Sequence, residues 1–220
     1  MTLNKYTWSY SSLKEYQNCP KKYYEIRVAK NYISQDTPQT IYGKEVHKAL
    51  EDYVKSNTAL AKNYERYKEL VDNLIAIPGE KYCEHEMALT KEKTPCEFES
   101  SDRWVRGICD LLIIDGDTAF IVDYKTGSNK YPDPKQLKLM ALMTFAHFPQ
   151  INKVKAGLLF LAHNQFIPEE YKRQDIDKYW GQFLGTLLRL DNSYETNTWQ
   201  PNPTPLCGYC PVKSCDFNKT

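Results

Sequence analysis

The sequence contains no long apolar run, and this absence limits the classes of protein that it can encode. Nowhere in the 220 residues do apolar side chains approach the roughly 18 consecutive positions that a membrane-spanning helix needs. The first 16 residues also lack the apolar core of a secretory signal peptide. We therefore expect no membrane span and a cytoplasmic location.

The sequence also lacks an excess of charge of either sign, internal repeats and low-complexity tracts. Its 29 Lys and Arg residues against 28 Asp and Glu residues give a net charge of +1, so a surface for a polyanion has to be a local patch. Hydrophobic residues make up 41% of the chain and charged residues 26%, which is ordinary for a globular protein that buries a core. The length suits one domain, or one domain with a small appendage.

Disulfides are not expected, although the chain has seven cysteines, because thiols stay reduced in the cytosol. Cys207, Cys210 and Cys215 have the spacing C-x2-C-x4-C in a Pro-rich tail, and two thiolates so close can bind one metal centre. Zinc or an iron–sulfur cluster bound by these three residues would need a fourth ligand. Cys19, near the other end of the chain, is the best candidate for it.

Hydrophobic periodicity predicts an alternation of helices and strands. Helices are predicted over residues 9–28 (broken at Cys19-Pro20), 40–54, 58–76, 135–148 and 179–194, and strands over 83–92, 103–116, 118–125 and 154–163. This order predicts an α/β fold whose mixed sheet is flanked by helices. We expect one domain over residues 1–220, with a helical part to about residue 80, a core over about 81–165, and a closing helix with a Cys-rich tail over about 166–220.

Two carboxylates lie among apolar residues on neighbouring predicted strands, Asp110 on the first and Asp123 on the second. The D-G-D turn between these strands predicts a hairpin, which would bring the carboxylates within a few ångströms, where they share a proton or bind a cation. Strict alternation places Asp110 on one face with Ile108 and Leu112, and Lys125 on the face of Asp123. An isolated Asp–Lys pair is ordinarily a solvated ion pair on a strand edge, and it is Asp110 that favours a cation site.

A bound divalent cation would explain these residues together. Mg²⁺ and Mn²⁺ take carboxylate and carbonyl oxygens as ligands, and such an ion can lower the pKa of water and hold a phosphoryl oxygen. An adjacent Lys would orient the nucleophile or neutralise developing charge. His47 and Gln136, on predicted helices, are further candidates, although a lone helical His is more often a packing or surface residue.

Basic and aromatic residues follow one another directly after Cys19, where Lys21 and Lys22 precede Tyr23 and Tyr24. Lys contacts backbone phosphates and aromatic rings stack on unpaired bases, so this segment is a candidate DNA-binding surface. The alternative is an amphipathic helix whose tyrosines lie in the core and whose lysines are solvated.

Four short motifs occur in one order along the chain, and together they resemble those of the RecB-type nucleases, which are metal-dependent DNA nucleases of the PD-(D/E)XK superfamily. The motifs are G-x-x-x-H (Gly43 to His47), G-x-x-D (Gly107 to Asp110), D-x-K-T-G (Asp123 to Gly127) and Q-L (Gln136 and Leu137). The resemblance implies a restriction-endonuclease-like core. It also implies metal ligation by His47, Asp110, Asp123 and the carbonyl of Tyr124, catalysis by Lys125, and support of the site by Gln136.

The sequence departs from the family pattern in the fourth motif. That motif usually has the form Q-x-x-x-Y, and Met140 stands where the Tyr is expected. Glu86, on the strand before Asp110, is a further residue that would either bear on the metal site or face solvent.

The cysteines resemble those of the iron–sulfur branch of the same family, which includes the AddB nuclease domain and the CRISPR-associated Cas-four exonucleases. The pattern S-x-S-x-L-x-x-Y-x-x-C-P, from Ser9 to Pro20, is also present. The resemblance implies a structural [4Fe–4S] cluster, with zinc as the alternative, on Cys19, Cys207, Cys210 and Cys215.

The resemblance implies a DNA exonuclease that hydrolyses phosphodiester bonds with Mg²⁺ or Mn²⁺, and it leaves endonuclease activity open. Its expected substrate is DNA that is single-stranded or has single-stranded ends. The expected pathway is DNA recombination or repair, CRISPR adaptation or phage DNA metabolism, with recombination or CRISPR adaptation proteins as partners and the host cytoplasm as location if the protein is phage-encoded. The alternative is a nuclease-fold protein that binds DNA, or acts as a recombination accessory, with little activity of its own. A zinc-only regulatory protein would leave the carboxylate pair unexplained.

Overall fold

The computed structural model describes residues 6–218, which form two compact units. Unit 1 consists of residues 6–7 and 37–179, and unit 2 consists of residues 8–36 and 180–218. Each unit therefore combines segments that are far apart in the sequence. The single domain expected over residues 1–220, with divisions near residues 80 and 165, stays a prediction.

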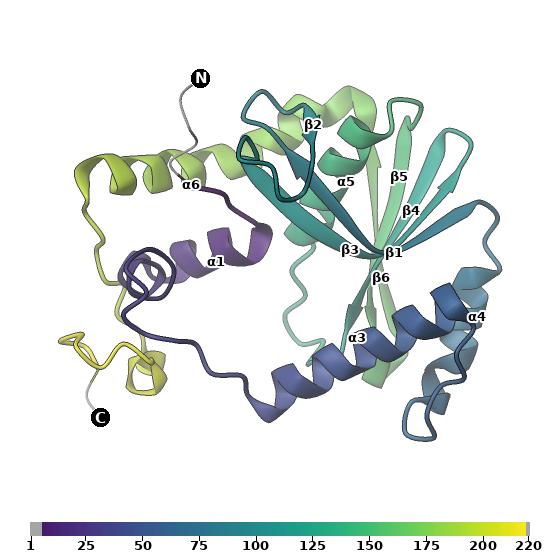
Figure 1. Cartoon of the computed structure of the whole chain (residues 1–220), viewed down its shortest axis with the longest axis horizontal. Coiled ribbons are helices and arrows are strands. Elements are labelled where there is room, and N and C mark those ends of the chain that lie inside the picture. The colour runs from purple at the N-terminus through teal and green to yellow at the C-terminus, as the bar shows by residue number, and fades with distance from the viewer. Residues whose placement is uncertain (1–5, 219–220) are drawn as a thin grey trace. The chain divides into compact units, whose positions relative to one another are not determined.

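Unit 1 is built on a six-stranded sheet with the order β2-β1-β3-β4-β5-β6 (Figure 1). The strands are β1 (Glu80–Leu89), β2 (Pro95–Cys96), β3 (Val105–Asp115), β4 (Thr118–Lys125), β5 (Lys153–Phe160) and β6 (Gln165–Lys172). β4 and β5 are parallel, and the other neighbouring pairs are antiparallel. A parallel pair needs a crossover connection, which α5 (Lys135–His147) supplies. The predicted mixed sheet is confirmed.

Helices cover both faces of this sheet (Figure 1). α3 (Pro38–Ser56) and α4 (Lys68–Ile75) pack on one face and share a core cluster with β3 and β4. α5 packs on the other face, and most of its side chains between Leu137 and Phe145 are buried. The predicted α/β fold with helices flanking the sheet is confirmed.

α3 begins and ends where the local chemistry favours it. The Thr37 side chain accepts a hydrogen bond from the Thr40 backbone N–H in a capping box, and Pro38 occupies the first turn. Asn57 ends the helix in the left-handed conformation, with a φ of 52°. The helix predicted over residues 58–76 is shorter than expected. After the turn at Asn57 the chain returns to α-helix only at Lys68, where α4 begins.

The sequence does not predict β6, which is the edge strand of the sheet. Pro168, Glu169 and Glu170 interrupt any apolar alternation within it, and most of the strand is exposed. Proline lacks an N–H donor but is tolerated on an edge strand, where one side of the ladder is unpaired. β6 is held by its antiparallel pairing with β5, which is a long-range property that the local pattern does not carry.

β3 changes faces partway along its length. Leu111 packs in the cluster with α3 and α4, whereas a Cβ at Gly107 would meet Met140 of α5. Residues four apart on a regular strand lie on the same face, so the alternation is interrupted between these two positions. The prediction of one continuous strand face through Ile108, Asp110 and Leu112 is therefore wrong.

Unit 2 is mainly helical. It contains α1 (Tyr10–Asn18), α2 (Pro20–Tyr23), a π-helical turn (Tyr24–Val28), the larger part of α6 (Ile176–Thr196) and the Cys-rich tail. The predicted break at Cys19 is confirmed, since this residue is extended between α1 and α2. The Tyr16 hydroxyl bonds to Ser193 of α6 at 2.8 Å, and the Trp8 ring lies 5.9 Å from that of Phe183. Neither α6 nor any other helix within residues 6–218 is long and apolar enough to cross a bilayer.

Candidate active site

The two predicted strand carboxylates lie across from each other on β3 and β4. Leu111 pairs with Val122, and the same register continued by one residue places Asp110 opposite Asp123. The backbone N–H of Tyr124 donates to Asp110 Oδ2 at 2.7 Å, which orients that carboxylate. The hairpin therefore brings the pair together.

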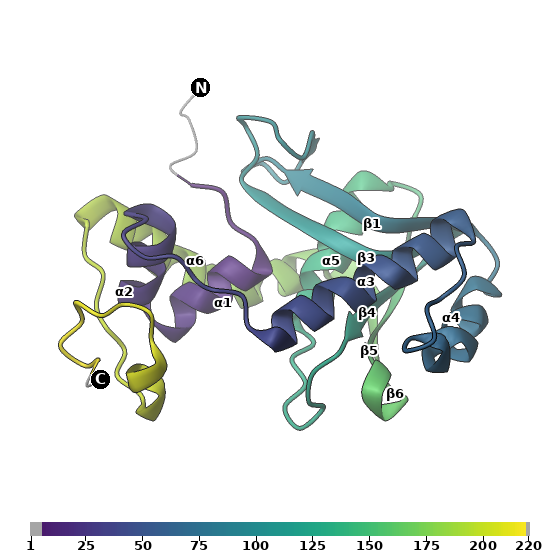
Figure 2. The same ribbon diagram turned by 60° about the horizontal axis from the view of Figure 1, so that its bottom comes forward.

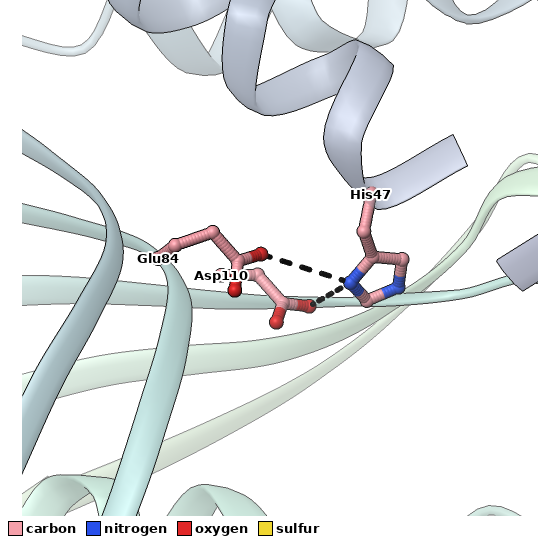
Figure 3. A group of neighbouring side chains, drawn as sticks. All are labelled: His47, Glu84 and Asp110. Atoms are coloured by element: carbon pink, nitrogen blue, oxygen red, sulfur yellow. Dashed lines mark ion pairs between the residues drawn. The ribbon is translucent and has the colours of Figure 1, made fainter. Parts of the chain in front are cut away.

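α3 brings His47 to these carboxylates (Figure 3). Its Nδ1 lies 3.5 Å from Asp110 Oδ2, and its Nε2 lies 3.0 Å from the backbone carbonyl of Tyr124. A carbonyl can only accept, so Nε2 carries a proton and donates it to Tyr124, while Nδ1 faces the Asp110 carboxylate. Gly43, one turn earlier, allows α3 to approach, because a Cβ there would lie 3.2 Å from Thr126 Oγ1.

Glu84 of β1 is a third carboxylate of this group, and the sequence did not reveal it. Its Oε1 lies 3.9 Å from His47 Nδ1, and the register of β1 on β3 places Glu84 across from Asp110. Figure 3 shows the three side chains, whose ligand atoms all lie within 4.8 Å of one another. Glu86, the β1 residue suggested by the sequence, is exposed to solvent and does not belong to the group.

The backbone at Glu84 explains how this side chain reaches the site. Its φ of 48° is left-handed, which is rare and strained for a residue other than glycine. β1 also changes faces here, since Cys83 packs against the cluster with α3 and α4 while Met87 contacts Thr144 of α5. The only signal in the sequence was a pair of acidic residues at alternating positions, and choosing Glu84 over Glu86 required this kink and the strand register.

Lys125 and Gln136 lie beside Asp123. Lys125 Nζ is 2.5 Å from Asp123 Oδ2 and donates to Gln136 Oε1 at 3.1 Å. Gln136 is in the first turn of α5, so the start of this helix holds the amine. Asp123 is 5% exposed, and apart from the ion pair its Oδ2 has no hydrogen-bond partner within residues 6–218. A buried, ionised oxygen of this kind needs further compensation by a cation or a proton.

Burial, together with the neighbouring charge of Asp110, shifts the pKa values of Asp123 and Glu84 upward. Burial and the charge of Asp110 raise the pKa of Asp123 to about 6, although Lys125 and His47 act in the opposite direction. Burial and Asp110 also raise the pKa of Glu84. Burial lowers the pKa of His47, but the neighbouring carboxylates, Asp110 first, raise it above the ordinary value overall. A bound cation would relieve this repulsion.

The site opens onto a pocket of about 900 Å³ beside α3. His47 and Glu84 line the pocket together with Lys44, Lys48 and the first two residues after β4. This volume is in the range of pockets that hold small ligands. Lys48 forms ion pairs with Glu51 and Asp52 of the same helix, and Glu51 also lines the pocket.

The donor set fits a hard divalent cation. Two atoms bound to one such ion lie no further apart than twice the metal–ligand distance, about 4–5 Å, and the ligand atoms of His47, Glu84 and Asp110 meet this limit. Carboxylates favour hard ions and imidazole favours borderline ones, so the set suits a divalent cation. The carbonyl of Tyr124 accepts a hydrogen bond from His47, and its predicted role as a ligand stays a prediction.

Met140, the departure from the family pattern, lies in the core. It is 3% exposed, and its Cε lies 2.3 Å from where a Cβ on Gly107 would be. Met140 therefore fills the space that Gly107 leaves, and Gln136 contacts Lys125 without a tyrosine at this position.

The four predicted cluster ligands line one small pocket of unit 2, namely Cys19, Cys207, Cys210 and Cys215. Backbone N–H groups point at two of the sulfurs: those of Lys22 and Asn202 donate to Cys19 Sγ at 3.5 Å, and that of Thr204 donates to Cys207 Sγ at 3.3 Å. Within residues 6–218, no three cysteines have Sγ atoms within 4.8 Å of one another. The predicted roles of these four cysteines as ligands of one centre stay predictions.

Tyr23, one of the predicted DNA-binding residues, lies in the core of unit 2. It is 2% exposed, and its ring stacks on that of Trp199 with 6.0 Å between centroids. No base can reach this ring, so the alternative of a core tyrosine applies to it. The roles of Lys21, Lys22 and Tyr24 in DNA binding stay predictions.

Comparison with known proteins matches almost the whole chain to one family. The profile of the PD-(D/E)XK nuclease superfamily matches residues 7–215. No curated protein matches the chain. Among solved structures, a candidate exonuclease from Eubacterium rectale has a TM-score of 0.55 at 11% identity, over 98% of this chain and 88% of that one, which shows similarity of fold alone. The crystal structure of SSO0001 has a TM-score of 0.49 at 16% identity, over 97% of this chain and 88% of that one.

Proposed function

Because the chain belongs to the PD-(D/E)XK nuclease superfamily, we propose that unit 1 is a deoxyribonuclease that removes nucleotides from DNA ends with a bound divalent cation. One observation carries this proposal: ligand atoms of His47, Glu84 and Asp110 converge within 4.8 Å of one another, on the hairpin where Lys125 contacts Asp123. A solvated ion pair on a strand edge gives no reason for a histidine and a third carboxylate to come to the same point from two other elements.

The proposed ligands are His47, Glu84, Asp110 and Asp123, with the carbonyl of Tyr124. When bound, Mg²⁺ or Mn²⁺ supplies an activated water and a contact to a phosphoryl oxygen. The chain orients its ligands through hydrogen bonds: Tyr124 accepts the Nε2 proton of His47, and its backbone N–H donates to Asp110. These contacts hold the imidazole and the carboxylate in place before a cation arrives.

Lys125 is the proposed catalytic lysine. An ammonium group has three donors, and Asp123 and Gln136 occupy two of the directions around it. The remaining donor is free to orient the attacking water or to stabilise negative charge on the phosphate in the transition state. Gln136 acts as a positioning residue, because its contact is with Lys125.

Digestion of labelled single-stranded and double-stranded DNA tests this proposal. We expect the wild type to shorten DNA with Mn²⁺ and not with EDTA. Lys125→Ala is expected to lose roughly 100-fold or more of the rate, as when other groups that stabilise transition-state charge are removed. Lys62→Ala, which changes an exposed lysine outside the pocket, should keep the wild-type rate. Equal digestion by the wild type and Lys125→Ala would overturn the site, and DNA binding without digestion would favour the accessory-protein alternative.

For unit 2, we propose a structural [4Fe–4S] cluster on the four pocket cysteines. The four cysteines line one pocket although Cys19 is far from the others in the sequence, as ligands of one centre must, and the resemblance of their pattern to the iron–sulfur branch favours the cluster over zinc. Hydrogen bonds from backbone N–H groups to sulfur, as at Cys19 and Cys207, also occur around such clusters. Iron and zinc contents with the visible spectrum of protein purified without air test this. A colourless, zinc-loaded protein would contradict it.

The remaining proposals concern the setting of the activity. DNA that is single-stranded or has single-stranded ends is the proposed substrate, and the cytoplasm is the proposed location. Recombination or repair, CRISPR adaptation and phage DNA metabolism are the candidate pathways. Products from strands labelled at the 5′ or the 3′ end would establish the direction of digestion.

A further inference from the structure

The loop between β4 and α5, residues 126–134, lies at one edge of the candidate active site. Lys125 precedes the loop and Gln136 follows it, and the hydrogen bond between these residues at 3.1 Å closes the loop at its base. Thr126 and Gly127 line the same pocket as His47. Figure 2 shows the loop extending beyond the ends of the strands.

Side-chain and backbone contacts restrain this loop. Asn129 Nδ2 donates to Gln165 Oε1 at 2.5 Å, and the Tyr171 hydroxyl donates to the carbonyl of Pro134 at 3.4 Å. Pro132 and Pro134 also fix φ at their positions. A loop that is restrained before binding loses less entropy when a ligand binds to it.

Tyr131 is the exposed aromatic residue of this loop. Its side chain is 81% exposed, and Lys130 Nζ lies over the ring at 5.3 Å from the centroid. An aromatic ring left in water contributes none of the free energy that its burial would supply to folding. The cation lies over one face of the ring, which leaves the other face open to a planar partner.

The chain places Tyr131 close to the proposed catalytic lysine. It is six residues from Lys125 and five residues from Gln136, and these two residues are in contact. One residue of extended chain spans at most about 3.6 Å, so the ring lies within a few nucleotides of a phosphate held at Lys125.

We propose that Tyr131 is a base-stacking platform of the nuclease: its ring stacks on an unpaired base of the strand whose phosphate lies at Lys125, and Lys130 contacts the adjoining backbone. This inference rests on the proposed function and names the residues that would select its single-stranded substrate. Bases within a duplex are covered by their neighbours, so the platform selects single-stranded DNA or a single-stranded end. Stacking accepts every base, so the selection is for strand state and not for sequence.

Exposed aromatic side chains also occur where nothing binds. Tyr209, in the tail of unit 2, is 87% exposed and provides a matched control for the general loss of an exposed tyrosine. Tyr131 differs from it in lying on a restrained loop that closes on Lys125, with Lys130 beside its ring.

Equilibrium binding of a fluorescent single strand, in EDTA so that the strand stays intact, tests the platform. Tyr131→Ala is expected to weaken binding roughly 10-fold or more, which is the size of base–aromatic stacking. Tyr131→Trp should retain the affinity because it retains a stacking surface. Since the side chain is largely exposed, neither substitution should unfold the protein, and unchanged melting temperatures would verify this.

The decisive measurement uses a series of strands, each of which lacks the base at one position. In the wild type one missing base should weaken binding more than any other, and in Tyr131→Ala that position should no longer matter, while Tyr209→Ala keeps the wild-type profile. The same profile in the wild type and Tyr131→Ala would overturn the inference. If the wild type digests DNA and its binding profile is the same as that of Tyr131→Ala, the platform is refuted and the proposed function stands. An inactive protein that shows the Tyr131-dependent position would support the platform and refute the proposed function.

Discussion

Asp110 connects three elements of the site through one carboxylate. Its Oδ2 accepts the Tyr124 backbone N–H at 2.7 Å and lies 3.5 Å from His47 Nδ1. The residue is thus oriented by β4 and faces both α3 and Glu84 of β1. A carboxylate that meets two other acids and one imidazole in a largely buried position is suited to a cation, because repulsion between the acids opposes folding without one.

Glu84 carries local strain that glycine would relieve. The left-handed backbone at this residue costs a side chain with a Cβ roughly 1 kcal/mol or more, and the nearby charge of Asp110 adds repulsion. We predict that Glu84→Gly raises the melting temperature in EDTA. It should also weaken Mn²⁺ binding at least tenfold, because a ligand is lost. Thermal unfolding and calorimetric titration measure the two effects.

Glu84→Gln is the matched control for this substitution. It keeps the backbone strain and removes the charge, so Mn²⁺ binding should weaken as much while the gain in melting temperature is smaller. A fall in the melting temperature of metal-free Glu84→Gly would refute the strain. Wild-type Mn²⁺ affinity in both variants would show that Glu84 is not a ligand.

Asp123 should make the metal-free protein less stable as the pH rises. Burial and Asp110 raise its pKa to about 6 in the folded state, against about 3.9 for an unperturbed Asp. The folded state holds this proton more tightly, so the stabilising contribution is complete below a pH of about 4 and is lost as the pH rises through about 6. We predict that Asp123→Asn gains stability relative to the wild type over this interval in EDTA.

Melting temperatures of both proteins across this pH interval check the prediction. With Mn²⁺ present, the wild type should have the higher melting temperature above a pH of about 6, because a bound cation favours its ionised carboxylate. A difference between the wild type and Asp123→Asn that does not change with pH in EDTA would contradict the shifted pKa.

At the scale of elements, the start of β1 depends on a glycine. Gly79 has a φ of 116°, and a Cβ there would lie 2.3 Å from the backbone oxygen of Ile114 on β3. Gly116, in the turn between β3 and β4, has a φ of 58° and nothing within 4 Å of such a Cβ. Gly116→Ala is expected to lower the free energy of unfolding by roughly 1–2 kcal/mol, and Gly79→Ala by clearly more. Urea unfolding compares the two, and equal losses would mean that β1 adapts to the added Cβ.

Elements with a strong local pattern could be predicted from the sequence. β3, β4 and α5 contain apolar runs that are bounded by turn residues or prolines, and the D-G-D turn fixes how the first two meet. β6 could not be predicted, because Pro168 interrupts the apolar alternation of this edge strand, and backbone groups make its pairing with β5. Glu84 could not be predicted either, because its place depends on the register between β1 and β3 and on a left-handed backbone. His47 and Asp123 could be proposed because their motifs are specific in combination.

At the scale of the whole molecule, unit 2 joins segments from both ends of the chain. The Asn202 backbone N–H donates to Cys19 Sγ at 3.5 Å, and its side chain donates to the carbonyl of Asn18 at 2.9 Å. The tail cysteines line the same pocket as Cys19. A centre bound to all four thiols would therefore close a loop that contains most of the sequence.

Cys19→Ser is predicted to remove the proposed cluster and to destabilise unit 2. A cross-link over so long a loop stabilises by about 5 kcal/mol in the chain-entropy estimate. We expect loss of iron and of visible absorbance, with faster proteolysis of residues 8–36 and 180–218. Mn²⁺ binding should be unchanged, because the proposed ligands all belong to unit 1.

Cys83→Ser is the control for this prediction, because Cys83 is a half-buried thiol of unit 1 outside the cysteine pocket. It should keep the iron content of the wild type. Full iron content in Cys19→Ser would contradict the ligand set.

The central claim is that a cation held at Asp110 and its neighbours cleaves DNA. The most direct test measures Mn²⁺ affinity and the digestion rate of labelled single-stranded DNA together, on the wild type and on folded Asp110→Asn. We predict that this variant binds Mn²⁺ at least tenfold more weakly and no longer digests the strand, because a neutral amide replaces the central ligand. Digestion by Asp110→Asn at the wild-type rate would contradict the claim.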